Sequence, residues 1–209
     1  MSAVPVIAGA GECLLTVRGS RFIARAAAVA NREEVDAVVA ALRAEHHRAS
    51  HVCFAYRLGR QSVEEFSSDA GEPSGTAGKP ILDALRSVEV RDALATVVRY
   101  FGGTKLGVRG LIDAYDAAAR GALAEARIAR TVLHRRWRAV VDYAAAAVLE
   151  SRVGERGGRW QPLDYGVAVT VELAFPAGET ALDEWLAGLR GSGALSSLEE
   201  LQPAWLSLQ

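Results

Sequence analysis

The sequence predicts an α+β protein of two domains, divided near residue 130. Before that point, short strand patterns and helix patterns mix, and two glycine-rich stretches each lead into a helix pattern. After it, the pattern restarts in the order strand, helix, strand, strand, helix, strand. This order is the split βαβ, ferredoxin-like arrangement, which typically spans about 70 residues. We therefore expect an N-terminal domain of residues 1–130 and a ferredoxin-like domain of residues 131–209.

In the N-terminal part, apolar runs and turn residues predict each element. Asn31 is a suitable N-cap, and Val35 and Val39 recur at helical spacing behind it. Pro80 is expected at the first position of a short helix, where no N–H is needed. We expect strands at residues 13–17, 21–24, 51–58 and 93–100, and helices at residues 31–48, 80–87 and 111–129.

In the C-terminal part, alternation around Trp137 predicts a half-exposed strand, and Gly157-Gly158 is expected to end the first helix. Asp164-Tyr165-Gly166 is expected to turn between two antiparallel strands. One strand face should carry Val167, Val169, Val171, Leu173 and Phe175. We expect strands at residues 137–143, 159–161, 166–175 and 194–201, and helices at residues 144–153 and 180–190.

The composition is that of a globular protein, since half of the 209 residues are apolar. The net charge of −1 argues against generalised binding to nucleic acid, so any such contact needs a local patch. Cys13 and Cys53 are the only cysteines and imply no disulfide framework. The sequence shows neither a convincing signal peptide nor an apolar run long enough to cross a bilayer. We expect a soluble cytoplasmic protein without membrane contact.

Two glycine-rich stretches, residues 69–80 and 99–110, carry seven glycines and both lysines of the chain. Each leads into a helix, so free N–H donors are expected at its end. Tyr100 and Phe101 would add a stacking face for RNA, unless they are core residues. The bland alternative is a pair of tight structural turns with solvated lysines. The candidate contacts for an anion or a partner are Glu72, Ser74, Thr76, Gly78, Lys79, Arg99, Lys105 and Arg109.

Known nucleotide motifs do not fit these stretches. A P-loop needs glycine and Ser or Thr where this chain has Pro73 and Pro80. The dinucleotide fingerprint is also absent, because the glycines between Gly103 and Gly110 lack its spacing. We therefore expect no cofactor.

Other chemistries have weaker candidates. His46, His51 and Cys53 resemble part of a metal site, but no second Cys/His pair completes four ligands, so no metal is expected. Asp69 and Glu72 are the candidate acid and base of an alternative hydrolase. A Cys53 nucleophile beside His51 has no further support in the sequence.

The chain resembles the IMPACT family in two long motifs. They are Ser68-Asp69-Ala70-Gly71-Glu72-Pro73-Ser74-Gly75-Thr76-Ala77-Gly78-Lys79-Pro80 and Val97-Val98-Arg99-Tyr100-Phe101-Gly102-Gly103-Thr104-Lys105-Leu106-Gly107. Glu45-His46 and His51-x-Cys53 also match. The resemblance is strong over residues 21–129 and looser beyond, through Leu149-Glu150 and Asp164-Tyr165-Gly166. Two departures are Ala70, where the family usually has Asp, and Arg109, where it usually has Gly.

The resemblance implies an N-terminal domain like the second domain of ribosomal protein S-five, and a C-terminal domain similar to one of elongation factor G. Eukaryotic members act in translational control by blocking activation of a stress kinase. For bacterial members, nucleic-acid or ribosome binding is an analogy from the fold.

Three functional hypotheses follow. The first is a non-enzymatic, translation-linked regulatory protein that binds RNA, the ribosome or a ribosome-associated protein through the two glycine-rich loops. The second is a hydrolase that uses Asp69 and Glu72, and the third is a protein-interaction module in stress signalling. The first requires that the two loops meet in space and present amides and cations to an open surface.

Overall fold

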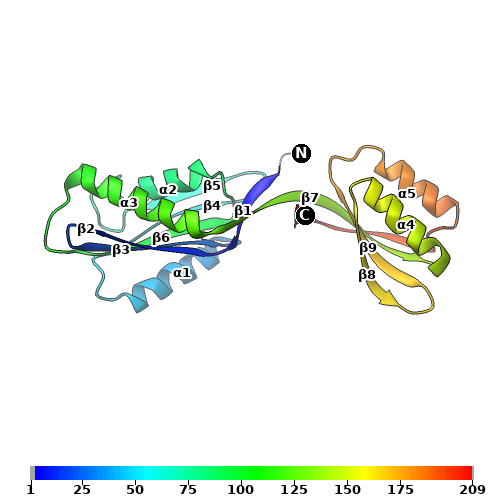
Figure 1. Ribbon diagram of the computed structural model, residues 1–209, viewed down its shortest axis with the longest axis horizontal. Coiled ribbons are helices and arrows are strands. Elements are labelled where there is room, and N and C mark those ends of the chain that lie inside the picture. The colour runs from blue at the N-terminus through cyan, green and yellow to red at the C-terminus, as the bar shows by residue number, and fades with distance from the viewer. Residues whose placement is uncertain (1–2, 209) are drawn as a thin grey trace. The chain divides into compact units, whose positions relative to one another are not determined.

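The computed structural model describes residues 3–208 and shows a mixed α/β chain in two compact units (Figure 1). One unit is Val4–Arg130, and the other begins at Thr131. Each has its own hydrophobic core. No helix of the described chain is long and apolar enough to cross a membrane.

The N-terminal unit contains a five-stranded antiparallel sheet in the order β2-β3-β6-β4-β5. The strands expected at residues 51–58 and 93–100 coincide with β4 and β6. Strands β1 and β5 were not predicted. The strands of this unit are β1 (Val4–Gly9), β2 (Gly11–Val17), β3 (Ser20–Ala28), β4 (His51–Leu58), β5 (Glu64–Ser68) and β6 (Ala93–Tyr100).

Helix α1 (Arg32–Glu45) covers one face of this sheet, and α2 (Gly78–Ser87) and α3 (Gly107–Glu125) cover the other (Figure 1). The side chain of Asn31 caps α1 by accepting a hydrogen bond from the N–H of Glu34 at 2.9 Å, as expected. The starts predicted for the other two helices are wrong. Helix α2 begins two residues before Pro80 and α3 four residues before residue 111. Pro80 fits there because every N–H of the first turn lacks an intrahelical partner.

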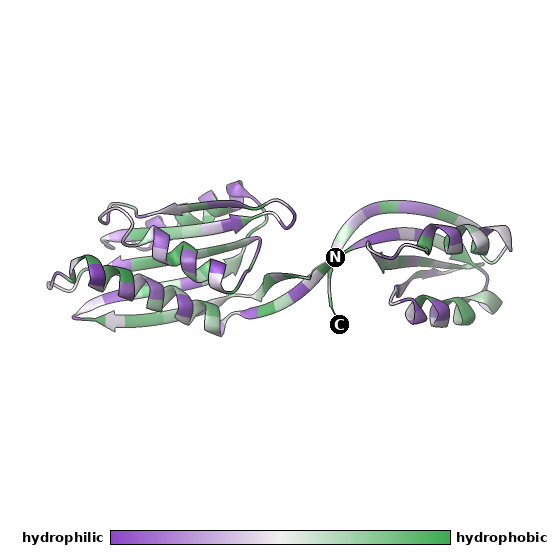
Figure 2. Cartoon of the chain, turned by 90° about the horizontal axis from the view of Figure 1, so that it is seen from above, coloured by the Kyte–Doolittle hydropathy of each residue, from purple (hydrophilic) through white to green (hydrophobic). Residues whose placement is uncertain are grey.

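Two apolar layers hold this unit together. Phe22, Ile81, Leu85 and Tyr115 are fully buried between the sheet and the pair α2 and α3. A smaller cluster under α1 includes Val35, Val39, Phe54 and Tyr56. The helices accordingly alternate between hydrophobic and hydrophilic sides (Figure 2). These layers cover the two faces of the sheet.

The C-terminal unit has the predicted order of strand, helix, strand, strand, helix, strand. In its sheet, β9 and β10 both pair with β7, and β8 pairs with β9. Strand β1 of the N-terminal unit joins the same sheet beside β7. Val171, Leu173, Phe175 and Leu182 are buried in its core. Val167 is the exception to the predicted apolar face, because it lies outside the strand and is fully exposed. The elements are β7 (Arg127–Val141), α4 (Tyr143–Glu155), β8 (Arg159–Tyr165), β9 (Val169–Pro176), α5 (Leu182–Gly191) and β10 (Ser197–Ser207).

Candidate functional site

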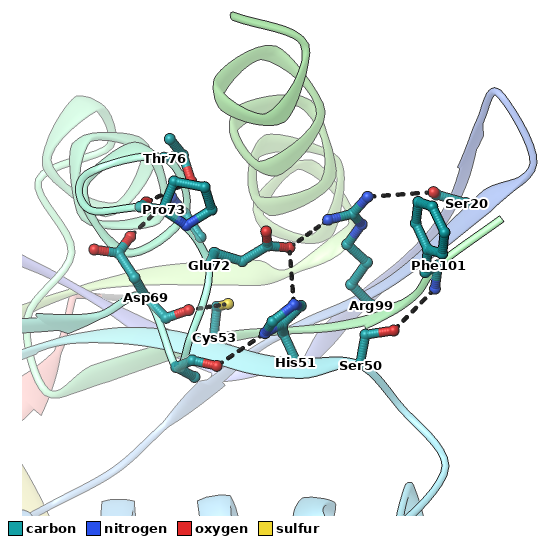
Figure 3. A network of polar contacts seen from close by, with 12 residues as sticks. Ser20, Ser50, His51, Cys53, Asp69, Glu72, Pro73, Thr76, Arg99 and Phe101 are labelled. Atoms are coloured by element: carbon teal, nitrogen blue, oxygen red, sulfur yellow. Dashed lines mark hydrogen bonds and ion pairs between the residues drawn. The ribbon is translucent and has the colours of Figure 1, made fainter. Parts of the chain in front are cut away.

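The two glycine-rich stretches meet at one end of the N-terminal sheet. Strand β6 ends there between the first residues of β3 and β4, because Tyr100 pairs with Arg21 and Arg99 pairs with His51. The first loop reaches this end through Glu72, whose carboxylate forms an ion pair with Arg99 at 2.6 Å (Figure 3). This juxtaposition could not be read from either stretch alone.

Glu72 and Arg99 form a buried charge pair rather than a surface for ligands. Their side chains are 3% and 6% exposed. Glu72 also accepts a hydrogen bond from the hydroxyl of Tyr115 at 2.8 Å, and His51 Nε2 lies 3.8 Å from it. A buried ion pair of this kind stabilises only while both partners remain. Both residues, predicted as partner contacts, therefore join the first loop to the sheet.

Asp69 organises the first loop from inside. Its carboxylate accepts hydrogen bonds from the N–H groups of Gly75, Ala77 and Gly78 at 2.8 to 2.9 Å. Partial burial alone would raise the pKa of Asp69, but these three hydrogen bonds outweigh it and hold the pKa below its usual value. The expected free donors of this loop are thus bound by an internal carboxylate. Both carboxylate oxygens of Asp69 are engaged in the loop, which gives no support to its predicted role in acid–base catalysis.

The other candidates of the first loop divide between interior and surface. Thr76 is buried and donates its hydroxyl to the carbonyl of Pro73 at 2.7 Å. Gly78 is buried against the backbone of Ser68. Ser74 is exposed, and exposed Lys79 pairs with Asp83 one turn along α2. Of the contacts predicted in this loop, only Ser74 and Lys79 are exposed.

The second loop is open to solvent. Residues 101–105 are all exposed, with Phe101 at 50% and Lys105 among them. The side chain of Arg109 is 88% exposed and pairs with Asp113. The first turn of α3 has no side-chain cap at Leu106. Arg109 and Arg18 both line a groove between α3 and β2. Exposed cations, an aromatic ring and an uncapped helix start therefore lie together here.

The histidines and Cys53 serve different roles. The carbonyl of Ala70 can only accept, so His51 Nδ1, at 2.9 Å, carries the proton. The thiol of Cys53 donates to the carbonyl of Asp69, and burial raises its pKa to about 12. A protonated, buried thiol is a poor nucleophile. His46 Nδ1 instead contacts the hydroxyl of Tyr100 at 2.9 Å. Among the described residues, no group of three or more His, Cys, Asp or Glu is placed to hold a metal ion.

Comparison with known proteins agrees with these motifs. The Impact N-terminal domain matches residues 18–123, which include both glycine-rich stretches. The chain belongs to the IMPACT family. It is 33% identical over 181 residues to IMPACT family member YvyE of Bacillus subtilis, covering 86% of this chain and 83% of YvyE. It is 36% identical over 190 residues to IMPACT family member YigZ of Escherichia coli, covering 88% and 92%.

A solved structure extends the likeness over both units of this IMPACT family member. The crystal structure of a hypothetical protein matches with a TM-score of 0.64 and 31% identity, covering 97% of this chain and 98% of the other. Four residues that contact or line the loops were not predicted from the sequence. They are Arg18, Ser20, Arg21 and Tyr115. Tyr115 lies within an apolar helix stripe, so its spacing gives no sign of its contact with Glu72.

Proposed function

We propose that this IMPACT family protein is a translation-linked regulatory protein that binds single-stranded RNA through its second glycine-rich loop. The link to translation comes from the family, whose eukaryotic members act in translational control. The observation that supports the RNA contact is the exposure of this loop, which carries Phe101, Lys105 and Arg109 on its surface. Cations track a phosphate backbone, and aromatic rings stack on unpaired bases.

The neighbouring hairpin adds two more cations to this surface. Arg18 shares the groove with Arg109. Arg21 lies with its guanidinium 5.0 Å from the ring centroid of Tyr100, at the edge of the same loop. We name Arg18, Arg21, Phe101, Lys105 and Arg109 the loop surface. A local surface of this kind is what a chain with net charge −1 needs to bind RNA.

The proposal also assigns a fold class to each unit and places RNA binding in one of them. We assign the C-terminal unit to the ferredoxin-like class from its strand order, and the N-terminal unit to the class of the second domain of ribosomal protein S-five from the family. On the strands of the C-terminal unit, charged side chains pair with each other, as Arg136 does with Glu172 and Arg138 with Glu199. We place RNA binding in the N-terminal unit because the exposed loop with Phe101 and Lys105 lies there.

The test is binding of a fluorescent single-stranded RNA at several salt concentrations. Lys105→Ala and Arg109→Ala should each weaken binding and lower the salt slope by about 0.7, because each removes one phosphate contact. Arg120→Ala is the matched control, since Arg120 also lies on α3 and also pairs with an aspartate one turn away. Unchanged affinity and slope in both loop variants would contradict the proposal.

A further inference from the structure

A separate hollow of about 310 Å³ lies at the same end of the N-terminal sheet. Its walls come from the end of α1, the start of β4 and the turn at Ala70. The polar side chains around it are Arg43, His46, His47, Ser50 and His51. No acidic residue is among those that line it. The loop surface does not include any of these groups.

We propose that this hollow binds a phosphate monoester, carried either by the end of an RNA strand or by a free nucleotide. A monoester carries up to two negative charges at neutral pH, against one for the internal diesters of RNA. Arg43 presents a fixed fork of donors that matches two phosphate oxygens. His46 and His47 add imidazole N–H groups as further donors.

The nearby carboxylates do not close the hollow to an anion. Glu45 lies 3.8 Å from His46 Nε2, but its side chain is 72% exposed and therefore screened by water. Glu72 lies 3.8 Å from His51 Nε2, and its charge is already paired with Arg99. The field inside the hollow is thus set by its own arginine and histidines.

His46, Ser50 and His51 on the walls of the hollow are held in place before any ligand arrives. The ring of His46 is tied through Nδ1 to the hydroxyl of Tyr100, and that of His51 through Nδ1 to the carbonyl of Ala70. Ser50 Oγ accepts a hydrogen bond from the N–H of Phe101 at 3.1 Å (Figure 3). Fixed groups lose little entropy on binding, which favours affinity.

The same contacts connect the hollow with the loop surface. Tyr100 touches His46 with its hydroxyl and Arg21 with its ring. Ser50, on the wall of the hollow, holds the backbone of Phe101. A strand bound along the loop surface would therefore end at the hollow, where a terminal phosphate fits. This choice of RNA end rests on the proposed function, whereas monoester binding does not.

Two measurements on the full chain test the inference. The first follows the histidine ring signals by NMR while inorganic phosphate, adenosine monophosphate or adenosine is added. The two phosphates should shift the signals of His46 and His47, and adenosine should not. The second compares one RNA sequence with a 5′-phosphate, a 3′-phosphate or hydroxyl ends. One phosphorylated form should bind about 10-fold more tightly, as expected of one charge-assisted contact.

Variants assign the effect to the hollow. Arg43→Ala and His47→Ala should abolish the preference for phosphorylated RNA and leave binding of the hydroxyl form unchanged. Both side chains are exposed, so the variants should fold. Arg32→Ala, at the other end of α1, is the matched control and should keep the preference.

The outcomes separate this inference from the proposed function. Signal shifts with the nucleotide but no RNA binding would support the hollow, with a free nucleotide as ligand, and would contradict RNA binding. Absence of any shift with phosphate and nucleotide, together with equal affinity for all RNA ends, would overturn the inference. A preference that survives both Arg43→Ala and His47→Ala would overturn it too.

Discussion

At the scale of single residues, the carboxylate of Asp69 occupies the backbone N–H groups that the sequence predicted would bind an external anion. The sequence places glycines before a helix, which is typical of anion binding through backbone N–H groups. Here the anion is the carboxylate of Asp69, eight or nine residues from two of its donors. The loop is thereby ordered from within, and it positions Glu72 against Arg99.

Asp69→Asn should lower the free energy of unfolding by about 2 kcal/mol at pH 7, because the amide loses the charge and one of the accepting oxygens. The folded pKa of Asp69 is depressed, so its contribution is full above the pKa of the unfolded chain, about 4, and is lost as the pH falls further. Urea denaturation at pH 7 and pH 3 measures both values. An equal difference between variant and parent at the two pH values would contradict this account.

At the scale of elements, the second loop owes its position to a close contact with the hairpin between β2 and β3. A Cβ added to Gly102 would lie 1.9 Å from the carbonyl carbon of Gly19. Gly19 itself has φ of +80°. The backbones therefore touch directly, which brings the hairpin and the second loop together although they are far apart in sequence.

Gly102→Ala should therefore destabilise the protein by about 3 kcal/mol, through a clash that neither backbone can relieve without moving. Gly103→Ala is the matched control. Gly103 has φ of +86° but no heavy atom within 4 Å of an added Cβ, so only backbone strain of about 1 kcal/mol is expected. Thermal or urea denaturation compares the two. Equal costs would show that the contact with Gly19 is unimportant for stability.

At the scale of the whole molecule, the loop surface and the hollow belong to the Val4–Arg130 unit. This unit has a complete sheet and both of its apolar layers. The second unit has its own core, and its sheet also includes β1 of the first unit. Binding to RNA should therefore need only the first unit.

A fragment of residues 1–130 should fold and bind single-stranded RNA within about twofold of the full chain, as expected of a unit with its own core. A fragment of residues 131–209 should fold without binding it. Circular dichroism establishes folding, and anisotropy with the same RNA establishes binding. Strong binding by the second fragment, or its loss from a folded first fragment, would place the RNA site elsewhere.

Much of the fold was predictable from local patterns. The apolar runs of β4 and β6 and the cap at Asn31 are signals carried by neighbouring residues, so they survive in the sequence. The short strand β5 was missed because its residues, Glu64–Ser68, are largely polar. It is a strand only by its pairing with β4 at the edge of the sheet.

By itself, the sequence determined the family, the two-part organisation of helices and strands, and the presence of two glycine-rich stretches. Only the tertiary structure decided which of these residues face solvent. Burial and exposure depend on segments that are distant in the chain. Glu72, Arg99 and Thr76 are buried in this way, whereas Phe101 and Lys105 are exposed. A local pattern records propensity, whereas burial and charge pairing arise when separate segments pack together.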